Sequence, residues 1–199
     1  ENKIMIISDE IHSDLIFKGH KHIPLATLSP EIAKNCMISM APSKTFNVAG
    51  LSSSLVIIPD KVKMARFERA IGVGHLGMGN IFGTVALEAA YTHGDEWLDE
   101  LLDYLWENYL LLENFFAKHL PKVKVMKPEA TYLIWLDFSA YGMKDAELMK
   151  FTVEKAGVGL NNGGKFGSGG DGWLRINIGC PRSTLEAALQ RLGAAFGGL

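Results

Sequence analysis

The chain centres on one stretch, Met40-Ala41-Pro42-Ser43-Lys44-Thr45-Phe46-Asn47-Val48-Ala49-Gly50. This stretch follows an apolar run, residues 36–40, that is typical of a short buried strand, and it leads into a second apolar run at residues 54–58. We therefore expect Lys44 just beyond the end of a strand. A lysine held there can be partly desolvated, which frees its amine to attack a carbonyl carbon. The alternative is a solvated loop lysine, the commoner fate of this residue type.

Two further segments place polar side chains close to a strand. Residues 3–8 are mostly apolar and lead into Asp9-Glu10-Ile11-His12-Ser13-Asp14, and residues 172–182 alternate in a strand-like manner around Arg175. Taken singly, Asp9, His12 and Arg175 would most often be a cap, a satisfied polar group and half of a structural ion pair. Their occurrence together with Lys44 favours a functional interpretation.

In order and spacing, these segments resemble the pyridoxal-phosphate-dependent aminotransferase family of fold type I, classes I and II, over nearly the whole chain. The sequences Asp-Glu-Ile-His, Pro-Ser-Lys-Thr-Phe-Asn and Leu-Arg-Ile-Asn-Ile-Gly-Cys-Pro-Arg are most similar to the cystathionine β-lyase and C–S lyase branch. The resemblance implies pyridoxal 5′-phosphate as cofactor, an amino acid as substrate and a homodimer for the full-length enzyme.

The resemblance also implies a role for each matching residue. Lys44 would be the Schiff-base lysine and then the base at the substrate α-carbon. Asp9 would pair with the pyridine nitrogen and keep the ring electron-withdrawing. His12 takes a position near the cofactor's phenolic oxygen that a tyrosine usually holds, and Arg175 would bind the substrate α-carboxylate with a bidentate fork.

The sequence departs from the family pattern at the phosphate anchor. Many aminotransferases carry an arginine eight residues after the lysine, where this chain has Ser52. Ser43 and Ser52 are then the expected phosphate ligands. Their hydroxyl groups can donate hydrogen bonds but compensate less charge than an arginine does.

The motifs match the C-terminal part of the family pattern. The phosphate-binding glycine turn, the stacking aromatic residue and the asparagine of the family's N-terminal half have no match in this chain. We therefore expect an α/β chain that forms the C-terminal portion of an enzyme of roughly twice its length. Residues 1–98 would be an incomplete remnant of the large cofactor-binding αβα domain, and residues 99–199 the complete small α/β domain.

Composition limits the other classes of function. The chain has 199 residues, 48% hydrophobic content and a net charge of −2, without the basic excess typical of nucleic-acid binding. No apolar run reaches the roughly 18 residues that would suggest a membrane span. Cys36 and Cys180 lie in apolar contexts without metal-ligand spacing, which predicts reduced thiols in a cytoplasmic protein and no metal site.

Hydrophobic spacing predicts the remaining elements in chain order. A helix should open at Pro59-Asp60, followed by a glycine-rich loop at residues 72–80, a buried alanine-rich helix at 81–91 capped by Gly94, and a long amphipathic helix from Asp95 to about His119. The loop contains a Gly-x-Gly-x-x-Gly string. We reject a dinucleotide site there because a helix, not a strand, precedes it.

The last hundred residues have the pattern of a compact α/β unit. Strands are predicted at residues 123–126, 131–136 and 173–178, with helices at 145–156 and 183–196 that Asp145 and Ser183 would cap. Residues 157–172 should form a mobile glycine-rich loop.

The predicted function is a C–S β-lyase that gives a thiol, pyruvate and ammonia when the enzyme is full length. One alternative is a class I/II aminotransferase that passes the amino group to a 2-oxo acid, because the same residues serve both reactions. The other alternative is that the chain by itself is a catalytically silent folded module, which we expect to bind the cofactor weakly.

Overall fold

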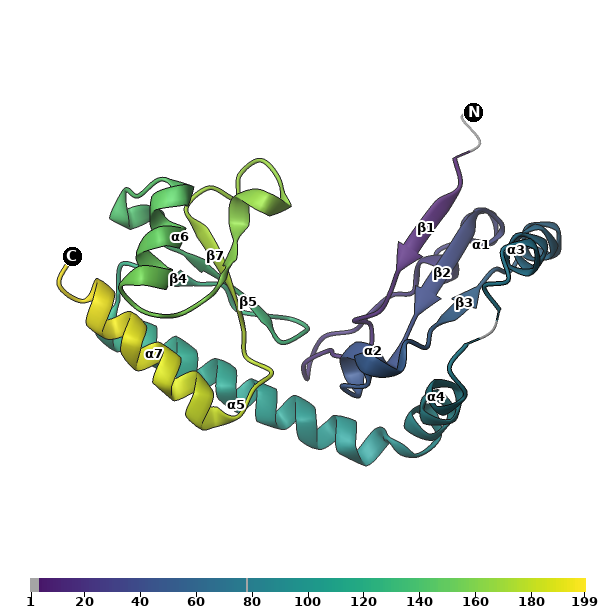
Figure 1. The fold of residues 1–199 in the computed structure, drawn as a ribbon, viewed down its shortest axis with the longest axis horizontal. Coiled ribbons are helices and arrows are strands. Elements are labelled where there is room, and N and C mark those ends of the chain that lie inside the picture. The colour runs from purple at the N-terminus through teal and green to yellow at the C-terminus, as the bar shows by residue number, and fades with distance from the viewer. Residues whose placement is uncertain (1–3, 78) are drawn as a thin grey trace. The chain divides into compact units, whose positions relative to one another are not determined.

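The computed structural model describes residues 4–77 and 79–199 and divides into two compact units, Glu1–Glu100 and Leu101–Leu199 (Figure 1). The long helix α5 (Asp95–His119) contains the boundary between them. Each unit has its own sheet. The predicted α/β fold class is confirmed.

Unit 1 is built on a three-stranded sheet in the order β1-β2-β3. The central strand β2 (Cys36–Met40) pairs in parallel with β1 (Ile6–Asp9) and antiparallel with β3 (Leu55–Ile57). These strands confirm the expected apolar runs, and residues 1–3 lie outside the described residues. The helical elements are η1 (Leu25–Thr27), α1 (Pro30–Asn35), α2 (Pro42–Thr45), η2 (Ala49–Leu51), α3 (Lys61–Val73) and α4 (Ile81–His93).

Helix α3 begins as the sequence predicts. The Asp60 side chain caps it by accepting a hydrogen bond from the backbone N–H of Lys63 at 2.9 Å. The helix continues two residues further than expected, because Gly72 and Val73 belong to it rather than to the loop that follows. A helix therefore does precede the Gly-x-Gly-x-x-Gly string, and Met78 lies outside the described residues.

Helix α4 has the predicted span and Gly94 at its C-cap, but the prediction that it is buried is wrong. Ile81 and Phe82 are 78% and 77% exposed. The helix approaches its own unit through Gly83, where an added Cβ would lie 2.1 Å from the Ser53 hydroxyl oxygen. An alanine-rich composition predicts that a helix packs closely against a neighbour. It does not predict which side of the helix makes that contact.

Helix α5 runs from Asp95 to His119 as predicted, and much of its apolar stripe is buried. The buried members are Leu105, Tyr109, Leu112 and Phe116. Asn108 lies among them with an exposed fraction of 0%, which the hydrophobic pattern did not indicate. Its amide nitrogen donates hydrogen bonds to the backbone oxygens of Ile178 at 3.0 Å and Cys180 at 3.2 Å. One polar side chain thus ties α5 to the chain that follows the last strand.

Unit 2 contains a four-stranded antiparallel sheet in the order β4-β5-β7-β6. The strands are β4 (Lys124–Val125), β5 (Leu133–Asp137), β6 (Asn161–Asn162) and β7 (Trp173–Asn177). The helical elements are η3 (Ser139–Tyr141), α6 (Asp145–Glu154), η4 (Gly163–Phe166) and α7 (Arg182–Phe196). Alternate residues of the two central strands are buried, namely Ile134, Leu136, Leu174 and Ile176. The opposite side of these strands carries Trp135 and Arg175.

Two details of unit 2 differ from the sequence-based expectations. The caps of α6 and α7 are Lys144 and Pro181, not Asp145 and Ser183. Asp145 does not cap α6, because its carboxylate instead accepts a hydrogen bond from the Gly172 backbone N–H at 2.8 Å. The predicted loop at 157–172 also contains regular structure, strand β6 and the turn η4.

The buried amide of Asn108 gives a stability prediction. We expect Asn108→Asp to lower the free energy of unfolding by about 2 kcal/mol, because a carboxylate oxygen would face two carbonyl oxygens and leave them without a donor. Urea unfolding of the chain at neutral pH measures this loss. Asn114→Asp, on an exposed position of the same helix, is the matched control and should change little. Equal effects of the two substitutions would contradict the assigned role of Asn108.

Candidate functional site

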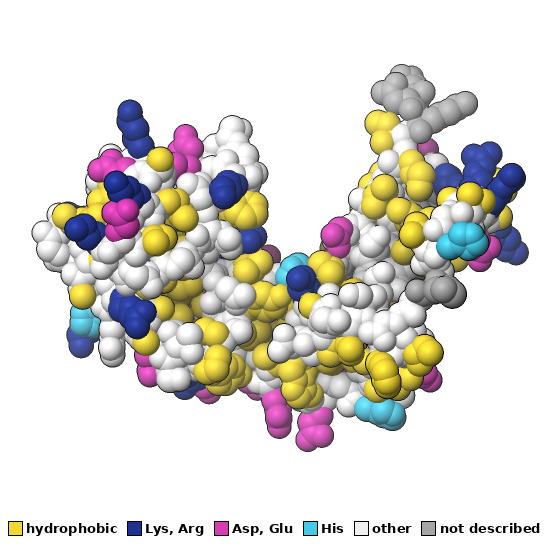
Figure 2. All heavy atoms as spheres, viewed as in Figure 1, with side chains coloured by type: hydrophobic (Ala, Val, Ile, Leu, Met, Phe, Trp, Pro, Cys, Tyr) yellow, Lys and Arg dark blue, Asp and Glu magenta, His cyan; other side chains and the backbone are white. Residues whose placement is uncertain are grey.

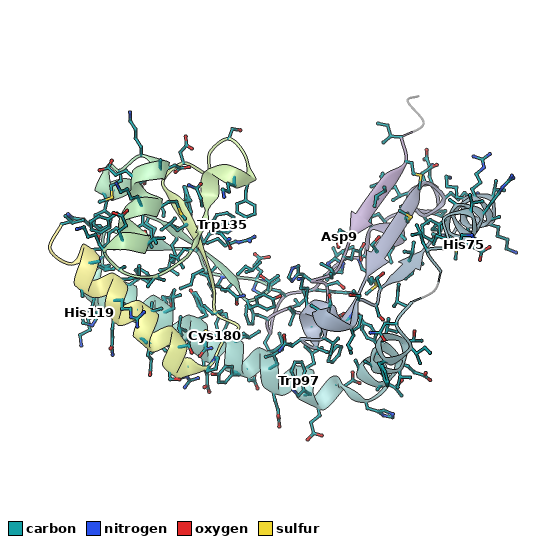
Figure 3. All side chains as sticks on the ribbon, in the orientation of Figure 1. Asp9, His75, Trp97, His119, Trp135 and Cys180 are labelled. Carbon is teal, nitrogen blue, oxygen red and sulfur yellow. The ribbon has the colours of Figure 1, made fainter. Side chains whose placement is uncertain are left out.

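The candidate site of unit 1 lies at the edge where β1 and β2 both end. Because these strands are parallel, with Asp9 opposite Ser39, their carboxyl ends meet at the same edge of the sheet. The pairing continues one residue further, since the Glu10 backbone N–H donates to the Ser39 oxygen at 2.9 Å. Figure 3 labels Asp9 at the end of β1. Helix α2, which carries Ser43 and Lys44, starts two residues after β2.

The turn after β1 places Asp9 and His12 close in the chain. Asp9 is exposed, and its Oδ1 accepts a hydrogen bond from the Ile11 backbone N–H at 3.2 Å. This contact folds the chain back beside the carboxylate. His12 lies in that turn and is half-buried. The structure therefore brings Asp9, His12, Ser43 and Lys44 to one edge of the unit 1 sheet.

The neighbouring carboxylate, Glu10, is buried and has a structural role. It is 6% exposed, and its oxygens contact the His22 ring nitrogen at 2.9 Å, the Leu25 backbone N–H at 3.0 Å and the Ser8 hydroxyl at 3.0 Å. Burial alone would raise the pKa of Glu10, but the hydrogen bonds from His22, Leu25 and Ser8 outweigh it and lower the pKa. Glu10 thus ties the segment around residues 22–25 to the end of β1.

Helix α2 is held by a buried contact immediately after Lys44. Thr45 is 0% exposed, and its hydroxyl donates to Asp14 Oδ2 at 2.8 Å. The same oxygen accepts from the Tyr91 hydroxyl of α4 at 3.4 Å. Burial and the negative charge of Asp14 raise the pKa of Tyr91 to about 12, so the phenol stays protonated and donates. Thr45, Asp14 and Tyr91 therefore hold the short helix that carries Lys44.

Phe46, the residue after Thr45, is the C-cap of this short helix. Its ring lies 5.7 Å from the ring of Tyr91 in an edge-on arrangement and 5.6 Å from the ring of Trp97. It also lies against Gly94, where an added Cβ would be 2.3 Å from a Phe46 ring carbon. The glycine that caps α4 is thus required for the packing of the residue two positions after Lys44.

Ser52 follows α2 in the chain, after η2. It is exposed and adopts a left-handed backbone conformation with φ of +51°. Such a conformation is uncommon for a residue other than glycine and marks a shaped turn. The N-cap of α4 contacts this turn, because the Asn80 side chain donates to the Leu51 oxygen at 3.3 Å.

Arg175 belongs to unit 2, in β7, where it lies opposite Trp135 of β5 and Asn161 of β6. Its guanidinium carbon is 4.3 Å from the centre of the Phe166 ring and 5.9 Å from that of Trp135. Its Nη2 donates to Asn161 Oδ1 at 3.3 Å, whereas its Nε is buried without a hydrogen-bond partner among the described residues. This unsatisfied donor indicates a binding site for an anion or another acceptor.

The donor set at the unit 1 edge fits pyridoxal phosphate. A lysine amine, an exposed carboxylate and a serine hydroxyl are of the chemical kinds that could hold its carbonyl carbon, ring nitrogen and phosphate. Among residues 4–77 and 79–199, no cluster of three potential metal ligands occurs and no helix is long and apolar enough to cross a membrane.

The sequence patterns missed the residues that hold the predicted ones. Asp14, Thr45 and Tyr91 are far apart in the chain, and a lone threonine after a lysine gives no signal of burial. Asn161 and Phe166 lie within residues 157–172, which the sequence predicts to be a mobile loop, whereas the structure places them in β6 and η4. The only available signal was a local one, the short polar Asn-Asn pair in front of a glycine turn.

The anchor at Thr45 gives a second stability prediction. We expect Thr45→Val to lower the free energy of unfolding by about 1.5–3 kcal/mol, since it removes a hydrogen bond to a partly buried carboxylate while keeping the side-chain shape. Thr27→Val is the matched control, because the Thr27 hydroxyl makes an exposed hydrogen bond within its own turn. Chemical unfolding of the chain would measure both. A loss no larger than that of the control would show that Asp14 does not anchor α2.

Comparison with known proteins places this geometry in a family. The aminotransferase class I and II family matches residues 1–192. The chain is 50% identical to cystathionine β-lyase PatB of Bacillus subtilis over 98% of its own length and 51% of that protein. Curated aspartate and aspartate/prephenate aminotransferases match at 26% and 27% identity.

Solved structures agree. A pyridoxal-phosphate-bound protein from Clostridium difficile, which carries an aminotransferase name, is 49% identical with a TM-score of 0.93 over 96% of this chain and 50% of that one. Cystalysin from Treponema denticola, whose structure contains pyridoxal 5′-phosphate, is 34% identical with a TM-score of 0.92 over 96% of this chain and 48% of that one. The chain spans about half the length of the relatives it matches. It belongs to the class I and II aminotransferase family, as the resemblance of its motifs implied.

Proposed function

We propose that this chain supplies the catalytic lysine to a pyridoxal-phosphate-dependent C–S β-lyase. Such an enzyme converts a cystathionine-like thioether amino acid into a thiol, pyruvate and ammonia. The supporting observation is that Asp9 ends β1 and that Lys44 lies in α2, which begins two residues after the parallel neighbour β2 ends, at the same edge of the sheet. The similarity to cystathionine β-lyases supports the reaction class over the more distant aminotransferases.

The residues of this chain would divide the work as follows. Pyridoxal phosphate, when bound, supplies an electron sink for negative charge at the substrate α-carbon. Lys44 takes the proton from that carbon, and its short helix is fixed by Thr45 so that the amine stays in place. Asp9 holds a proton at the ring nitrogen. Once the α-proton has been removed, the thiolate can leave from the β-carbon.

The remaining side chains would bind rather than react. Ser43 and Ser52 donate hydroxyl hydrogen bonds to the cofactor phosphate, and His12 hydrogen-bonds near the phenolic oxygen. Arg175 binds the substrate α-carboxylate, for which its planar guanidinium group is suited. The full-length protein would then contain residues 1–98 in a larger cofactor domain and residues 99–199 as a small domain. The division into units within α5 supports this arrangement.

Product analysis separates the lyase from an aminotransferase, because both begin by removing the same proton. The full-length protein with L-cystathionine should form pyruvate without any added 2-oxo acid. Lys44→Ala should lower that rate by at least about a thousandfold, since the general base is lost. Lys61→Ala, on the exposed start of α3, is the control and should keep the rate. A strict requirement for a 2-oxo acid would instead favour the aminotransferase.

Cofactor binding tests whether the isolated chain is a silent module. Adding pyridoxal phosphate to the full-length protein should produce an absorbance near the visible edge that Lys44→Ala lacks. The chain of 199 residues alone should show little of it, because it spans about half of the related enzymes. A strong, Lys44-dependent absorbance from the chain alone would reject the silent-module alternative.

We also propose that the full-length enzyme is a cytoplasmic homodimer. The exposed apolar side chains of α4, Ile81, Phe82 and Val85, support an interface (Figure 2 shows hydrophobic side chains gathered over this helix). The free thiols of Cys36 and Cys180 support a reducing compartment.

The proposed interface gives a prediction on assembly. Phe82→Glu should convert the full-length dimer to a monomer, because it would bury a charge without a partner in an apolar contact. Val153→Glu replaces a 51% exposed apolar residue of α6 and should leave the dimer intact. Sedimentation velocity distinguishes the two states, and a Phe82→Glu protein that still sediments as a dimer would remove α4 from the interface.

A further inference from the structure

The Arg175 guanidinium has one side-chain amide and two aromatic rings as close neighbours. Asn161 accepts one hydrogen of Nη2 at 3.3 Å, and the Phe166 ring covers one face of the guanidinium plane at 4.3 Å. The ring centre of Trp135, labelled in Figure 3, lies 5.9 Å from the guanidinium carbon, and the Trp135 ring is edge-on to Phe166 at 5.3 Å. All of these residues belong to unit 2.

The hydrogen-bond inventory of Arg175 singles out one edge of the group. Nε carries one hydrogen, which is buried and has no partner among the described residues. Nη2 carries two hydrogens, and only one of them is donated in the hydrogen bond to Asn161 Oδ1. A buried N–H without a partner costs free energy that an incoming oxygen would recover. The edge formed by Nε and Nη2 is therefore the one prepared for a ligand.

We propose that Asn161 and Phe166 are positioning residues that make Arg175 bind a carboxylate side-on, with one oxygen at Nε and the other at Nη2. Asn161 fixes the rotation of the guanidinium in its plane, and Phe166 fixes the tilt of that plane. The inference rests on the proposed role of Arg175 as the substrate carboxylate ligand.

The loop that carries Phe166 is built tightly enough for this role. An added Cβ on Gly163 would lie 2.4 Å from the Gly170 oxygen, and one on Gly170 would lie 2.2 Å from the Gly163 oxygen. The Trp173 backbone N–H also donates to the Gly170 oxygen at 3.1 Å. The two glycines let the loop close on itself beside β7, so the glycine-rich sequence here gives close packing.

The test uses nuclear magnetic resonance of the 199-residue chain labelled with ¹⁵N-arginine, because each arginine gives one Nε–H signal. Arg175→Lys identifies the signal by removing it. Titration with acetate should move the Arg175 Nε–H signal downfield and saturate, and acetamide should not. Asn161→Ala and Phe166→Leu should each raise the acetate dissociation constant about tenfold, which is the loss of about 1.4 kcal/mol.

Two variants serve as controls. Asn162→Ala alters the neighbouring residue of β6, which pairs with Leu174 rather than Arg175, and should leave the dissociation constant unchanged. Phe166→Tyr keeps an aromatic face and should bind acetate like the unaltered chain. An Nε–H signal that does not move while acetate binds, or Asn161→Ala and Phe166→Leu proteins with unaltered affinity, would overturn the proposal.

Kinetics of the full-length protein separate positioning from folding. Asn161→Ala and Phe166→Leu should raise the KM for L-cystathionine about tenfold and change kcat less than about twofold, because the interaction lost is made in the ground state as well. A fall in kcat without a rise in KM would contradict side-on positioning. Acetate-dependent shifts without pyruvate formation would reject the lyase and retain the positioning role, and pyruvate formation without such shifts would do the reverse.

Discussion

The parallel pairing of β1 with β2 is the constraint on which the candidate site depends. It alone sets Asp9 and the start of α2 at the same edge, although 34 residues separate Asp9 from Lys44 in the sequence. An antiparallel pairing would have placed them at opposite ends. A one-residue slip would turn Asp9 to the other face, because side chains alternate along a strand. The register is fixed by buried residues of β2 such as Cys36 and Ile38.

The same alternation gives two adjacent carboxylates different tasks. Asp9 is the last residue of its strand and is exposed, so its carboxylate is accessible to a ligand. Glu10 points the other way into a pocket of donors, where a lowered pKa keeps it charged and paired. Stability would therefore fall with acid as Glu10 becomes protonated. Asp9 differs, because its carboxylate accepts an exposed hydrogen bond from the Ile11 backbone N–H. Position on the strand, rather than residue type, separates the anchor from the candidate catalytic group.

The spacing of apolar residues in the sequence predicts most of the fold. The chemistry of the side chains predicts most of the candidate site. Strand β2 and helix α5 have the bounds that apolar spacing predicts, because burial on one side leaves a period in the sequence. Burial of α4 was mispredicted, since an apolar helix does not say which partner covers it. The Thr45–Asp14 contact was also missed, because a hydrogen bond across 31 residues leaves no local pattern.

Two neighbouring arginines differ in the side chains that they contact, and this difference separates a structural arginine from a candidate binding residue. Arg175, in β7, and Arg182, the first residue of α7, are seven residues apart in the sequence. Arg182 pairs with Glu107 at 2.7 Å, and this contact raises the pKa of Arg182. It also lies over the ring of Tyr104, so its charge is already matched by its own chain. We therefore assign Arg182 a structural role.

Arg175 contrasts with Arg182 in the nature of its contacts. Its hydrogen-bond acceptor among the described residues is a neutral amide, and its other close neighbours are aromatic rings. None of these cancels a positive charge, and the buried Nε still lacks an acceptor among them. A guanidinium that is held firmly but left without an anion is prepared for one from outside the unit. This difference in partners, which the sequence string cannot express, is why Arg175 rather than Arg182 is the candidate for the substrate carboxylate.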